Sequence, residues 1–488
     1  MHIIQITPEM VPFAKTGGLA DVTGALPKQF ASMGHKVSVF MPLYKQVKDN
    51  TRNLVSTDVS VSVKIGDETR SGIIWKYQAS DSQASHKGKV DVYFIQRDEY
   101  YHRDNLYSTP EGDYWDNAER FIFFSRATLE AIKALNLKPD VIHCHDWQSA
   151  LVPIYTRTLY KKDFGSVKTV ITVHNLAYQG SFWHWDMKLT GLDWSLFNWK
   201  QLEFWGKLNF LKGGLVFSDI ITTVSPRYAQ EIQTHEFGCG LEGVLKERSK
   251  HLFGIINGID YGDWNPDTDR LIPDRYAPDK LQGKAKNKVA LQRGGQMLER
   301  DVPIIGMVTR LADQKGLDMV SEVFDDLMKM NIQFVLLGTG DEKYHKKFSE
   351  LGRKYQVKTS MHITFDNSLA HLIIAGSDML LVPSRYEPCG LSQLYALKYG
   401  TVPIVRETGG LADTIINYAP DKIKTANGFS FKNYSSQMML GIIKNAVQVY
   451  NDKKVWKQLM SNGMSQDWSW GHSANEYLGL YKNRLPKD

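Results

Sequence analysis

Cysteine, long hydrophobic runs and clusters of basic residues are all scarce in this sequence of 488 residues. Its three cysteines stand at positions 144, 239 and 389. Such an odd, sparse set argues against a disulfide framework and is typical of a reducing compartment. No apolar run reaches the ~20 residues of a membrane-spanning helix, and the first residues lack the pattern of a signal or transit peptide. We therefore expect a cytoplasmic protein with no membrane partner.

A large excess of charge of one sign is also absent. The chain has 59 Lys and Arg against 53 Asp and Glu, a formal net charge of +6. Nucleic-acid-binding proteins usually carry clustered Lys and Arg, and no such block is present. The modest positive excess suits a small anionic substrate better than nucleic acid, so we expect no nucleic-acid partner.

Motifs for cofactors and metals are missing as well. The first glycine-rich turn is neither G-x-G-x-x-G nor a P-loop, which disfavours a dinucleotide or Walker site and hence an NAD-dependent oxidoreductase. Three histidines, His143, His145 and His174, lie at or just after the ends of strand-like segments, but their spacing fits neither a zinc signature nor a helical H-x-x-x-H pair. We expect no metal and no cofactor.

Short apolar segments alternate with helical patterns along the chain. Residues 2–6 are predicted to form a strand, residues 18–33 an amphipathic helix that ends at Gly34, and residues 36–41 a second strand. The other predicted strands are 91–95, 139–143, 168–174, 219–225, 251–256, 302–308, 332–338, 361–365, 378–384 and 401–405, with a strong helical pattern over 112–135. This order predicts an α/β protein with two doubly wound halves.

The first turn of the chain reads "AKTGGLAD" and lies between a predicted strand and a predicted helix. The unpaired N–H groups at a helix start, the two glycines Gly17 and Gly18 and the cation Lys15 together favour an anion at this turn. A tight turn with a solvated lysine is the alternative. The identical string "TGGLAD" recurs at 408–413, which is either coincidence or a second turn of the same purpose.

Two further turns in the second half carry charged residues. Arg310 and Lys315 follow the strand at 302–308, and two cations so placed can bracket a diphosphate, unless they are only surface charges. Glu387 stands in "SRYEPCGLS", after another strand, where it could reach a sugar hydroxyl or a developing positive charge. The N–H groups of Leu391 and Ser392, after Gly390, could hold phosphate oxygens. An ordinary helix-capping acid is the alternative for Glu387.

Taken together, these strings resemble a known family. "KTGGLADV", "HDWQ", "TVHNLAYQG", "INGID", "SRYEPCGLSQLYALKYG" and "TGGLADT" occur in this order over nearly the whole chain. They resemble bacterial glycogen synthases and the related plant starch synthases. The resemblance implies the GT-B architecture, two Rossmann-like domains facing a deep interdomain cleft. Residues 1–256 would form the first domain and residues 257–468 the second, and a helix at 469–488 would complete the first.

The resemblance also implies a reaction. Glucose would pass from ADP-glucose to the non-reducing end of an α-1,4-glucan such as glycogen, with retention of configuration. The implied catalytic residues are Glu387, His174 and Lys15. The implied substrate-binding residues are Lys15, Gly17, Gly18, Asp21, Asp146, Trp147, Asn257, Arg310, Lys315, Phe365, Gly390, Leu391 and Ser392.

Two positions depart from the wider pattern. Many GT-B enzymes have a second glutamate eight residues after the first, whereas this chain has Tyr395, as glycogen and starch synthases do. Bacterial relatives often have a tyrosine where this chain has Phe365. A phenyl face can still stack on adenine.

A segment outside these motifs is rich in tryptophan. Residues 183, 185, 194, 199 and 205 are five of the twelve tryptophans of the chain. Sugar faces pack on aromatic rings, so part of this segment could guide a glucan acceptor. The alternative, which we favour from sequence alone, is that these rings fill a core under a long insertion.

Two other functions stay open on the sequence alone. One is a different retaining GT-B transferase, such as a sucrose-forming or UDP-sugar enzyme. The other is a catalytically silent glucan-binding protein, against which the retained cations argue because a neutral polysaccharide does not need them. The nucleotide released when glycogen is added would distinguish these functions.

Overall fold

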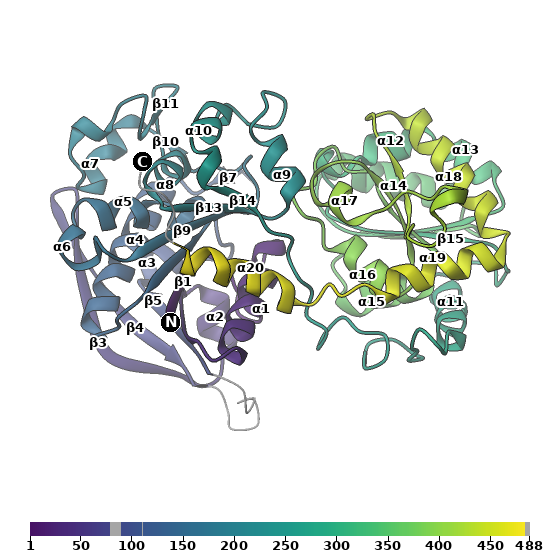
Figure 1. Ribbon diagram of the computed structural model, residues 1–488, viewed down its shortest axis with the longest axis horizontal. Coiled ribbons are helices and arrows are strands. Elements are labelled where there is room, and N and C mark those ends of the chain that lie inside the picture. The colour runs from purple at the N-terminus through teal and green to yellow at the C-terminus, as the bar shows by residue number, and fades with distance from the viewer. Residues whose placement is uncertain (79–88, 110, 484–488) are drawn as a thin grey trace. The chain divides into compact units, whose positions relative to one another are not determined.

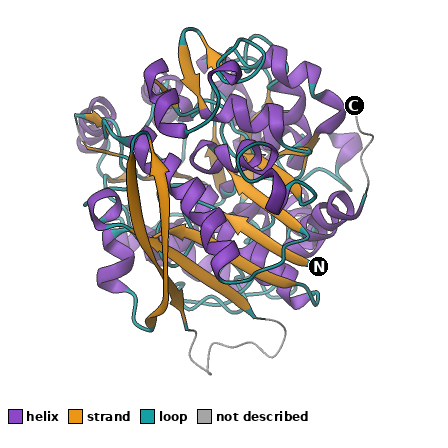
Figure 2. Ribbon diagram, turned by 90° about the vertical axis from the view of Figure 1, so that its left-hand side faces the viewer, coloured by secondary structure: helices purple, strands orange, loops and turns teal. Residues whose placement is uncertain are grey.

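The computed structural model describes residues 1–78, 89–109 and 111–483. The chain forms two compact units. The first contains residues 1–224, 229–255 and the chain from Trp470 on, and the second contains residues 225–228 and 256–469. Each unit is an α/β structure in which helices flank a largely or wholly parallel sheet (Figures 1 and 2). The predicted doubly wound α/β fold is thereby confirmed.

The first unit is built on a nine-stranded sheet. Seven strands pair in parallel, and β3 and β4 extend the sheet at one edge as an antiparallel hairpin. In spatial order the strands are β14 (Leu252–Gly254), β13 (Ile220–Thr223), β9 (Lys168–Val173), β8 (Val141–His145), β1 (His2–Ile6), β2 (Lys36–Pro42), β5 (Val90–Gln96), β4 (Glu68–Tyr77) and β3 (Leu54–Ile65).

Short strands and helices complete this unit. The short strands are β6 (Ser108–Thr109), β7 (Gly112–Asp113), β10 (Ser181–Phe182), β11 (Glu203–Phe204) and β12 (Lys207–Asn209). The helices are α1 (Gly18–Ser32), α2 (Lys45–Asn50), α3 (Asp98–Tyr101), α4 (Asn117–Ala134), α5 (Leu151–Arg157), α6 (Lys161–Phe164), α7 (Met187–Thr190), α8 (Phe210–Phe217), α10 (Glu242–Glu247) and α20 (Trp470–Lys482), and α9 (Pro226–Glu231) begins in the segment that belongs to the second unit.

The last helix, α20, packs on the first unit beside α1 (Figure 1). Tyr477 and Tyr481 contact the ring of Phe30 on α1. The Lys168 ammonium of β9 donates to the Tyr481 carbonyl at 2.7 Å. Burial of these rings attaches the end of the chain to its beginning, because a buried aromatic side chain removes a large apolar area from water.

The second unit has a six-stranded sheet that is parallel throughout. Its strands, in spatial order, are β17 (Thr359–His362), β16 (Gln333–Leu337), β15 (Ile304–Val308), β18 (Met379–Val382), β19 (Val402–Arg406) and β20 (Phe429–Phe431). Its helices are α11 (Gln282–Gly294), α12 (Leu317–Glu322), α13 (Phe324–Lys329), α14 (Glu342–Lys354), α15 (Asn367–Gly376), α16 (Ser392–Lys398), α17 (Gly409–Thr414), α18 (Ser436–Tyr450) and α19 (Lys453–Ser465).

Both sheets reverse their strand order beside their first strand. In the first unit the chain runs from β1 through β2 to β5 on one side and from β8 onward on the other, and in the second it reverses between β15 and β18 in the same way. Open α/β sheets bind ligands at such a switch point, outside the carboxyl ends of the strands. The loops after β1, β8, β15 and β18 are therefore the places to look for a site.

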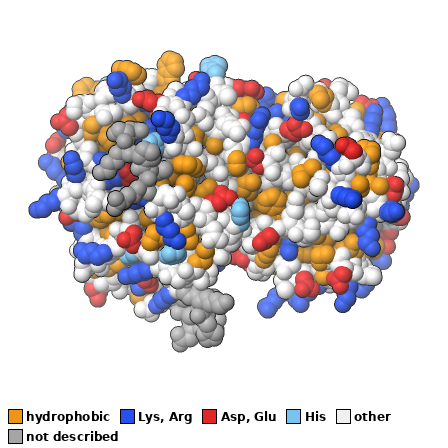
Figure 3. Space-filling view, viewed as in Figure 1, with side chains coloured by type: hydrophobic (Ala, Val, Ile, Leu, Met, Phe, Trp, Pro, Cys, Tyr) orange, Lys and Arg blue, Asp and Glu red, His pale blue; other side chains and the backbone are white. Residues whose placement is uncertain are grey.

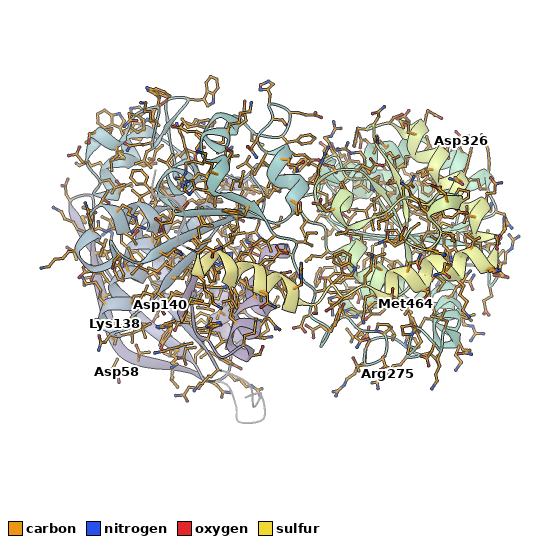
Figure 4. All side chains as sticks on the ribbon, viewed as in Figure 1. Asp58, Lys138, Asp140, Arg275, Asp326 and Met464 are labelled. Atoms are coloured by element: carbon orange, nitrogen blue, oxygen red, sulfur yellow. The ribbon has the colours of Figure 1, made fainter. Side chains whose placement is uncertain are left out.

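Strand β8 begins and ends two residues later than the sequence predicts. Lys138 and Asp140, labelled in Figure 4, lie before it and fix the start of β1 instead: the Asp140 carboxylate accepts from the His2 N–H at 2.7 Å, and the Lys138 carbonyl lies 3.2 Å from His2 Nδ1. The strand then continues to His145, so that His143 and His145 lie within it and are buried. The sequence predicts that this strand ends at His143, so the prediction is wrong for Cys144 and His145, which belong to the strand as well.

Charges of both signs cover the surface. On the face drawn in Figure 3, Lys and Arg side chains are interspersed with Asp and Glu side chains over both units. None of the described helices is long and apolar enough to cross a membrane.

Candidate functional site

In the first unit, the loop after β1 is organised by the buried carboxylate of Glu9. One carboxylate oxygen accepts from the Thr16 N–H at 2.5 Å and from the Gly17 N–H at 3.3 Å. The other accepts from the hydroxyls of Thr16 at 2.6 Å and of Tyr107 at 2.8 Å. Glu9 therefore already occupies two N–H groups next to the start of α1, which the sequence offered for an anion.

Lys15 pairs with Asp21 of the first turn of α1. The Lys15 ammonium lies 2.7 Å from the Asp21 carboxylate, and both side chains are partly exposed. Gly17 precedes α1, which begins at Gly18 as predicted, and a methyl group added at Gly17 would meet nothing within 4 Å. The structure thus brings Lys15, Asp21 and the Gly17–Gly18 turn together at the carboxyl end of β1.

Asp146 follows β8 on the other side of the switch point and holds the backbone of His174. Its carboxylate accepts from the His174 N–H at 2.7 Å, and its own backbone has a positive φ of 56°. Burial, together with the nearby Glu9 carboxylate, raises the pKa of Asp146 to about 7. A non-glycine residue with positive φ is uncommon and is often found at functional sites.

The three histidines form a chain in which His143 and His145 are buried and His174 is partly buried. His174 Nε2 lies 3.0 Å from His145 Nδ1, and the rings of His145 and His143 are 4.2 Å apart. Burial lowers the pKa of His174 and of His143 to about 3, so these imidazoles are neutral near pH 7. Among the described residues, no group of three His, Cys, Asp or Glu side chains is arranged to hold a metal ion.

Trp147 is less accessible than the other predicted site residues of this unit. Only 9% of it is exposed, and its ring packs against those of Phe121, Phe182 and Phe210. Its position after Asp146 keeps it near the carboxyl edge of the sheet, where most of its surface is already taken by other rings.

In the second unit, β15 ends at Val308, and the loop after it carries both predicted cations. Arg310 is exposed, and its guanidinium donates to the Gln314 side chain at 3.3 Å. Lys315 is followed by Gly316, whose φ is 72° and where a Cβ would come 2.3 Å from the Pro383 carbonyl. Gly316 therefore allows the loop after β15 to approach the loop after β18, and α12 begins directly after it.

Glu387 lies between Lys315 and Ser384. The Lys315 ammonium is 2.6 Å from Glu387 Oε2, and the Ser384 hydroxyl donates to the same oxygen at 2.7 Å. The Lys315 and Glu387 side chains are 16% and 10% exposed. Lys315 and Ser384 both bind Oε2. Among the described residues no hydrogen bond to Oε1 is found, so this oxygen is available to another partner. The alternative that Glu387 only caps a helix is wrong, since its side chain bonds Lys315 and Ser384 instead.

The second "TGGLAD" turn supports the loop that carries Glu387. The Gly410 N–H donates to the carbonyls of Glu387 and Pro388 at 3.2 and 3.1 Å. Gly409 has a φ of 46°, and a Cβ there would come 2.0 Å from the Glu387 carbonyl. This turn acts on the backbone of Glu387, whereas the first turn is held by the side chain of Glu9, so the two copies serve different contacts.

The remaining predicted residues of this unit lie around the same strand ends. Gly390 and Leu391 directly precede α16, which begins at Ser392. Asn257 is 5% exposed, and its Oδ1 has no hydrogen-bond partner among the described residues. Phe365 lies in the loop before α15 and is 79% exposed. The Asn257 oxygen without a partner and the exposed Phe365 ring can each contact a ligand.

Several supporting residues have no signal in the sequence. Arg406 donates to the carbonyl of Ser384 at 2.9 Å and also to that of Arg385. Trp264 stacks between His371 and Tyr395, with ring centroids 3.7 and 3.8 Å apart. Tyr395, at the position of the missing second glutamate, is thus part of an aromatic stack. Glu9 is the clearest omission, and its place between a strand and a glycine-rich turn is a signal that could have identified it.

The tryptophans of 183–205 do not fill a core. Trp183, Trp185, Trp194, Trp199 and Trp205 are all exposed. The interpretation favoured from the sequence is therefore wrong, because the short strands β10, β11 and β12 hold this insertion together while its indole rings point outward.

Comparison with known proteins agrees with this arrangement. Residues 2–247 match the family model described as the starch synthase catalytic domain, and residues 292–459 match that of the glycosyl transferases group 1. A glycogen synthase of Koribacter versatilis is 48% identical over 99% of this chain and 98% of its own length. A glycogen synthase of Thermosipho melanesiensis is 47% identical over the full length of both.

Solved structures show the same similarity to starch synthases. The catalytic domain of starch synthase IV from Arabidopsis thaliana, bound to ADP and acarbose, is 35% identical with a TM-score of 0.90 and 98% coverage of both chains. A sucrose-phosphate synthase from Thermosynechococcus elongatus has a TM-score of 0.60 at 17% identity, which shows the shared fold alone. The chain therefore belongs to the glycogen and starch synthase family, whose members are GT-B glycosyltransferases.

Proposed function

We propose that this glycosyltransferase takes glucose from ADP-glucose and adds it to the non-reducing-end 4-hydroxyl of an α-1,4-glucan, with retention of configuration. The observation that carries the proposal is the group formed by Lys315, Glu387 and Ser384 at the switch point of the second sheet. The starch synthase of similar structure was solved with ADP and acarbose bound.

Lys315 and Arg310 are proposed to bind the diphosphate of the donor. The leaving group gains negative charge as the glycosidic bond breaks, and cations fixed at that place stabilise the transition state more than the ground state. An ammonium group has three N–H donors, so the bond of Lys315 to Glu387 leaves capacity for phosphate oxygens. The N–H groups of Gly390, Leu391 and Ser392 are further candidates for these oxygens.

Glu387 is proposed to act on the glucosyl unit. Its Oε2 is held by Lys315 and Ser384, which fixes the carboxylate, while Oε1 can face a sugar hydroxyl or the positive charge that develops at the anomeric carbon. Phe365 offers an exposed ring for the adenine, and Asn257 an unpaired carbonyl oxygen for a polar group of the donor.

Residues of the first unit are proposed to contact the substrates from the carboxyl ends of β1 and β8. Lys15, with Asp21 and the Gly17–Gly18 turn, would bind the phosphates or the glucosyl unit. Neutral His174 would donate to or accept from a glucose hydroxyl, held in place by Asp146. Asp146 and Trp147 are proposed to lie toward the acceptor.

The experiment that tests the proposal compares two donors. The purified protein is incubated with glycogen and either ADP-[14C]glucose or UDP-[14C]glucose, and radioactivity in precipitated glycogen is counted. We expect incorporation from ADP-glucose at a rate at least about tenfold higher, a difference of about 1.4 kcal/mol in transition-state binding. Faster incorporation from UDP-glucose would contradict the assigned donor, and no incorporation from either would contradict the proposed reaction.

A further inference from the structure

Five aromatic rings form a contiguous surface cluster on the loop that joins β9 to α8. We call this cluster the aromatic platform, and it consists of Trp183, His184, Trp185, Trp194 and Phe197. The Trp183 and Trp185 rings have centroids 6.4 Å apart, those of Trp185 and Trp194 are 5.5 Å apart, and those of Trp194 and Phe197 are 5.8 Å apart. His184 lies between, 5.3 Å from Trp185 and 6.3 Å from Phe197.

The three indole rings of the platform are open to solvent. Trp183 is 64% exposed, Trp185 54% and Trp194 44%. Exposed large apolar side chains gathered in one patch usually mark an interaction site, whereas scattered single ones do not. Trp199 and Trp205 are also exposed but make no ring contact with the platform, so they serve as an internal comparison.

The backbone under the platform is held in place. Met187 and Leu192, which lie between Trp185 and Trp194 in the sequence, are buried and anchor this part of the segment. The Asp193 carboxylate accepts from the Ser195 N–H at 2.8 Å, and the Asn198 side chain donates to the Ser195 carbonyl at 2.7 Å. A platform with a fixed backbone loses little conformational entropy on binding, which favours a ligand that makes only a few contacts.

The platform is continuous with the carboxyl edge of the first sheet. Its loop leaves β9 at His174, and Phe182, just before Trp183, packs on Trp147 with ring centroids 5.6 Å apart. Trp147 follows Asp146 at the end of β8. A long polymer bound at the ends of β8 and β9 can therefore follow the same loop to the platform.

We propose that the aromatic platform is a separate binding site for the α-glucan acceptor, used by long chains and not by short ones. This rests on the proposed function, since it takes the glucan to be the acceptor. The C–H faces of pyranose rings are apolar and pack on the negative faces of indole rings. A polymer that binds at both places is held at a high effective concentration, which raises its affinity without any new contact at the reacting end.

A glucan fits the platform better than a protein partner does. A standard protein interface covers about 800 Å² on each partner, and three half-exposed indole rings offer much less. Asp186 directly follows Trp185 and Asn198 directly follows Phe197 in the sequence, so each ring residue has a polar neighbour whose oxygen atoms can accept from sugar hydroxyls. An uncharged chain with alternating apolar faces and hydroxyl edges matches this combination.

The test compares W183A/W185A with the unchanged protein and with W205A, which removes a still more exposed indole from the same insertion. Binding is measured by gel electrophoresis with and without embedded glycogen, and kinetics with glycogen, maltotriose and ADP-glucose. We expect W183A/W185A to bind glycogen about tenfold more weakly and to show a similarly raised KM for glycogen. The KM values for maltotriose and ADP-glucose should stay unchanged, as should all values for W205A.

Three results would overturn the platform site. In the first, glycogen retards W183A/W185A as strongly as the unchanged protein. In the second, the KM of W183A/W185A for maltotriose rises as much as its KM for glycogen. In the third, W183A/W185A changes its oligomeric state on size-exclusion chromatography. W194A provides a second variant and should also weaken retardation. Electrophoresis uses no donor, so loss of the proposed transfer reaction with retained, tryptophan-dependent retardation would refute the function and leave the platform standing.

Discussion

The ion pair between Lys315 and Glu387 is the central feature at the scale of single residues. It joins the loop after β15 to the loop after β18, and Ser384 adds a third contact to the same carboxylate oxygen. Both side chains are nearly buried, so this is not a typical surface ion pair, whose contribution to stability is usually small. Because open α/β sheets bind ligands at such switch points, we propose that this pair acts on a ligand as well as on the two loops.

Substitution of Lys315 by methionine tests the role of this cation. The variant keeps the length of the side chain but cannot stabilise the departing diphosphate, so we expect kcat/KM for ADP-glucose to fall by about 10² or more. Lys329→Met, at an exposed lysine paired with Asp326, is the matched control and should stay within about 0.5 kcal/mol of the unchanged protein. Steady-state release of ADP measures both. Similar values for the two variants would contradict the role of Lys315.

At the scale of elements, a buried polar chain connects the core strands of the first unit to the last helix. The Tyr481 hydroxyl of α20 lies 2.7 Å from His143 Nδ1 on β8, and His143 Nε2 lies 2.6 Å from the Thr172 hydroxyl on β9. Thr172 is in turn 2.6 Å from Thr222 on β13. Four elements therefore depend on a neutral imidazole at position 143.

These buried hydrogen bonds of His143 predict that the stability of the protein depends on pH. Burial lowers the pKa of His143 to about 3 in the folded state, against 6.5 for an ordinary histidine. The stability from keeping His143 neutral is thus present above pH 6.5 and is lost as the pH falls toward 3, at about 1.4 kcal/mol per pH unit. Because His143→Gln removes this proton uptake, its melting temperature should fall less steeply from pH 6.5 to pH 5.

The control for this prediction is His472→Gln, since His472 is exposed on α20 and pairs there with Glu476. Calorimetric scans at several pH values compare the three proteins. Parallel curves for the unchanged protein and His143→Gln would contradict the assignment of a neutral, buried His143.

The elements that the sequence predicts well are those with a continuous apolar run. β1, α1, β2 and β15 are found within two residues of their predicted bounds because fully buried parallel strands and amphipathic helices have strong patterns. The hairpin of β3 and β4 was not predicted, although the alternation of buried and exposed residues in the second half of β3 is typical of a strand with one buried face. β10, β11 and β12 are too short to leave a pattern at all.

Only some of the site residues could be predicted from the sequence. Glycine-rich turns after strands located Lys15, Lys315 and Glu387, because such turns are local in sequence. The partners that fix them come from distant segments: Tyr107 contacts Glu9, and Arg406 contacts the carbonyl of Ser384. Contacts of this kind depend on the completed sheets and have no periodicity in the sequence.

At the scale of the whole molecule, both units use the same plan. Each has a parallel sheet whose strand order reverses beside its first strand, and each places charged residues after the strands on both sides of that reversal. The similarity to glycogen synthases extends over nearly the full length of the chain and therefore over both units. The second unit carries the Lys315, Glu387 and Ser384 group on which the proposed chemistry depends.

The measurement that tests this account most directly is single-turnover glucose transfer by Glu387→Gln. Donor binding is measured separately by calorimetry, and Glu322→Gln, an exposed position on α12, serves as control. We predict that Glu387→Gln binds ADP-glucose within a few-fold of the unchanged protein but transfers glucose to glycogen at least about 10²-fold more slowly. Transfer by Glu387→Gln at nearly the rate of the unchanged protein would contradict the central role given to this carboxylate.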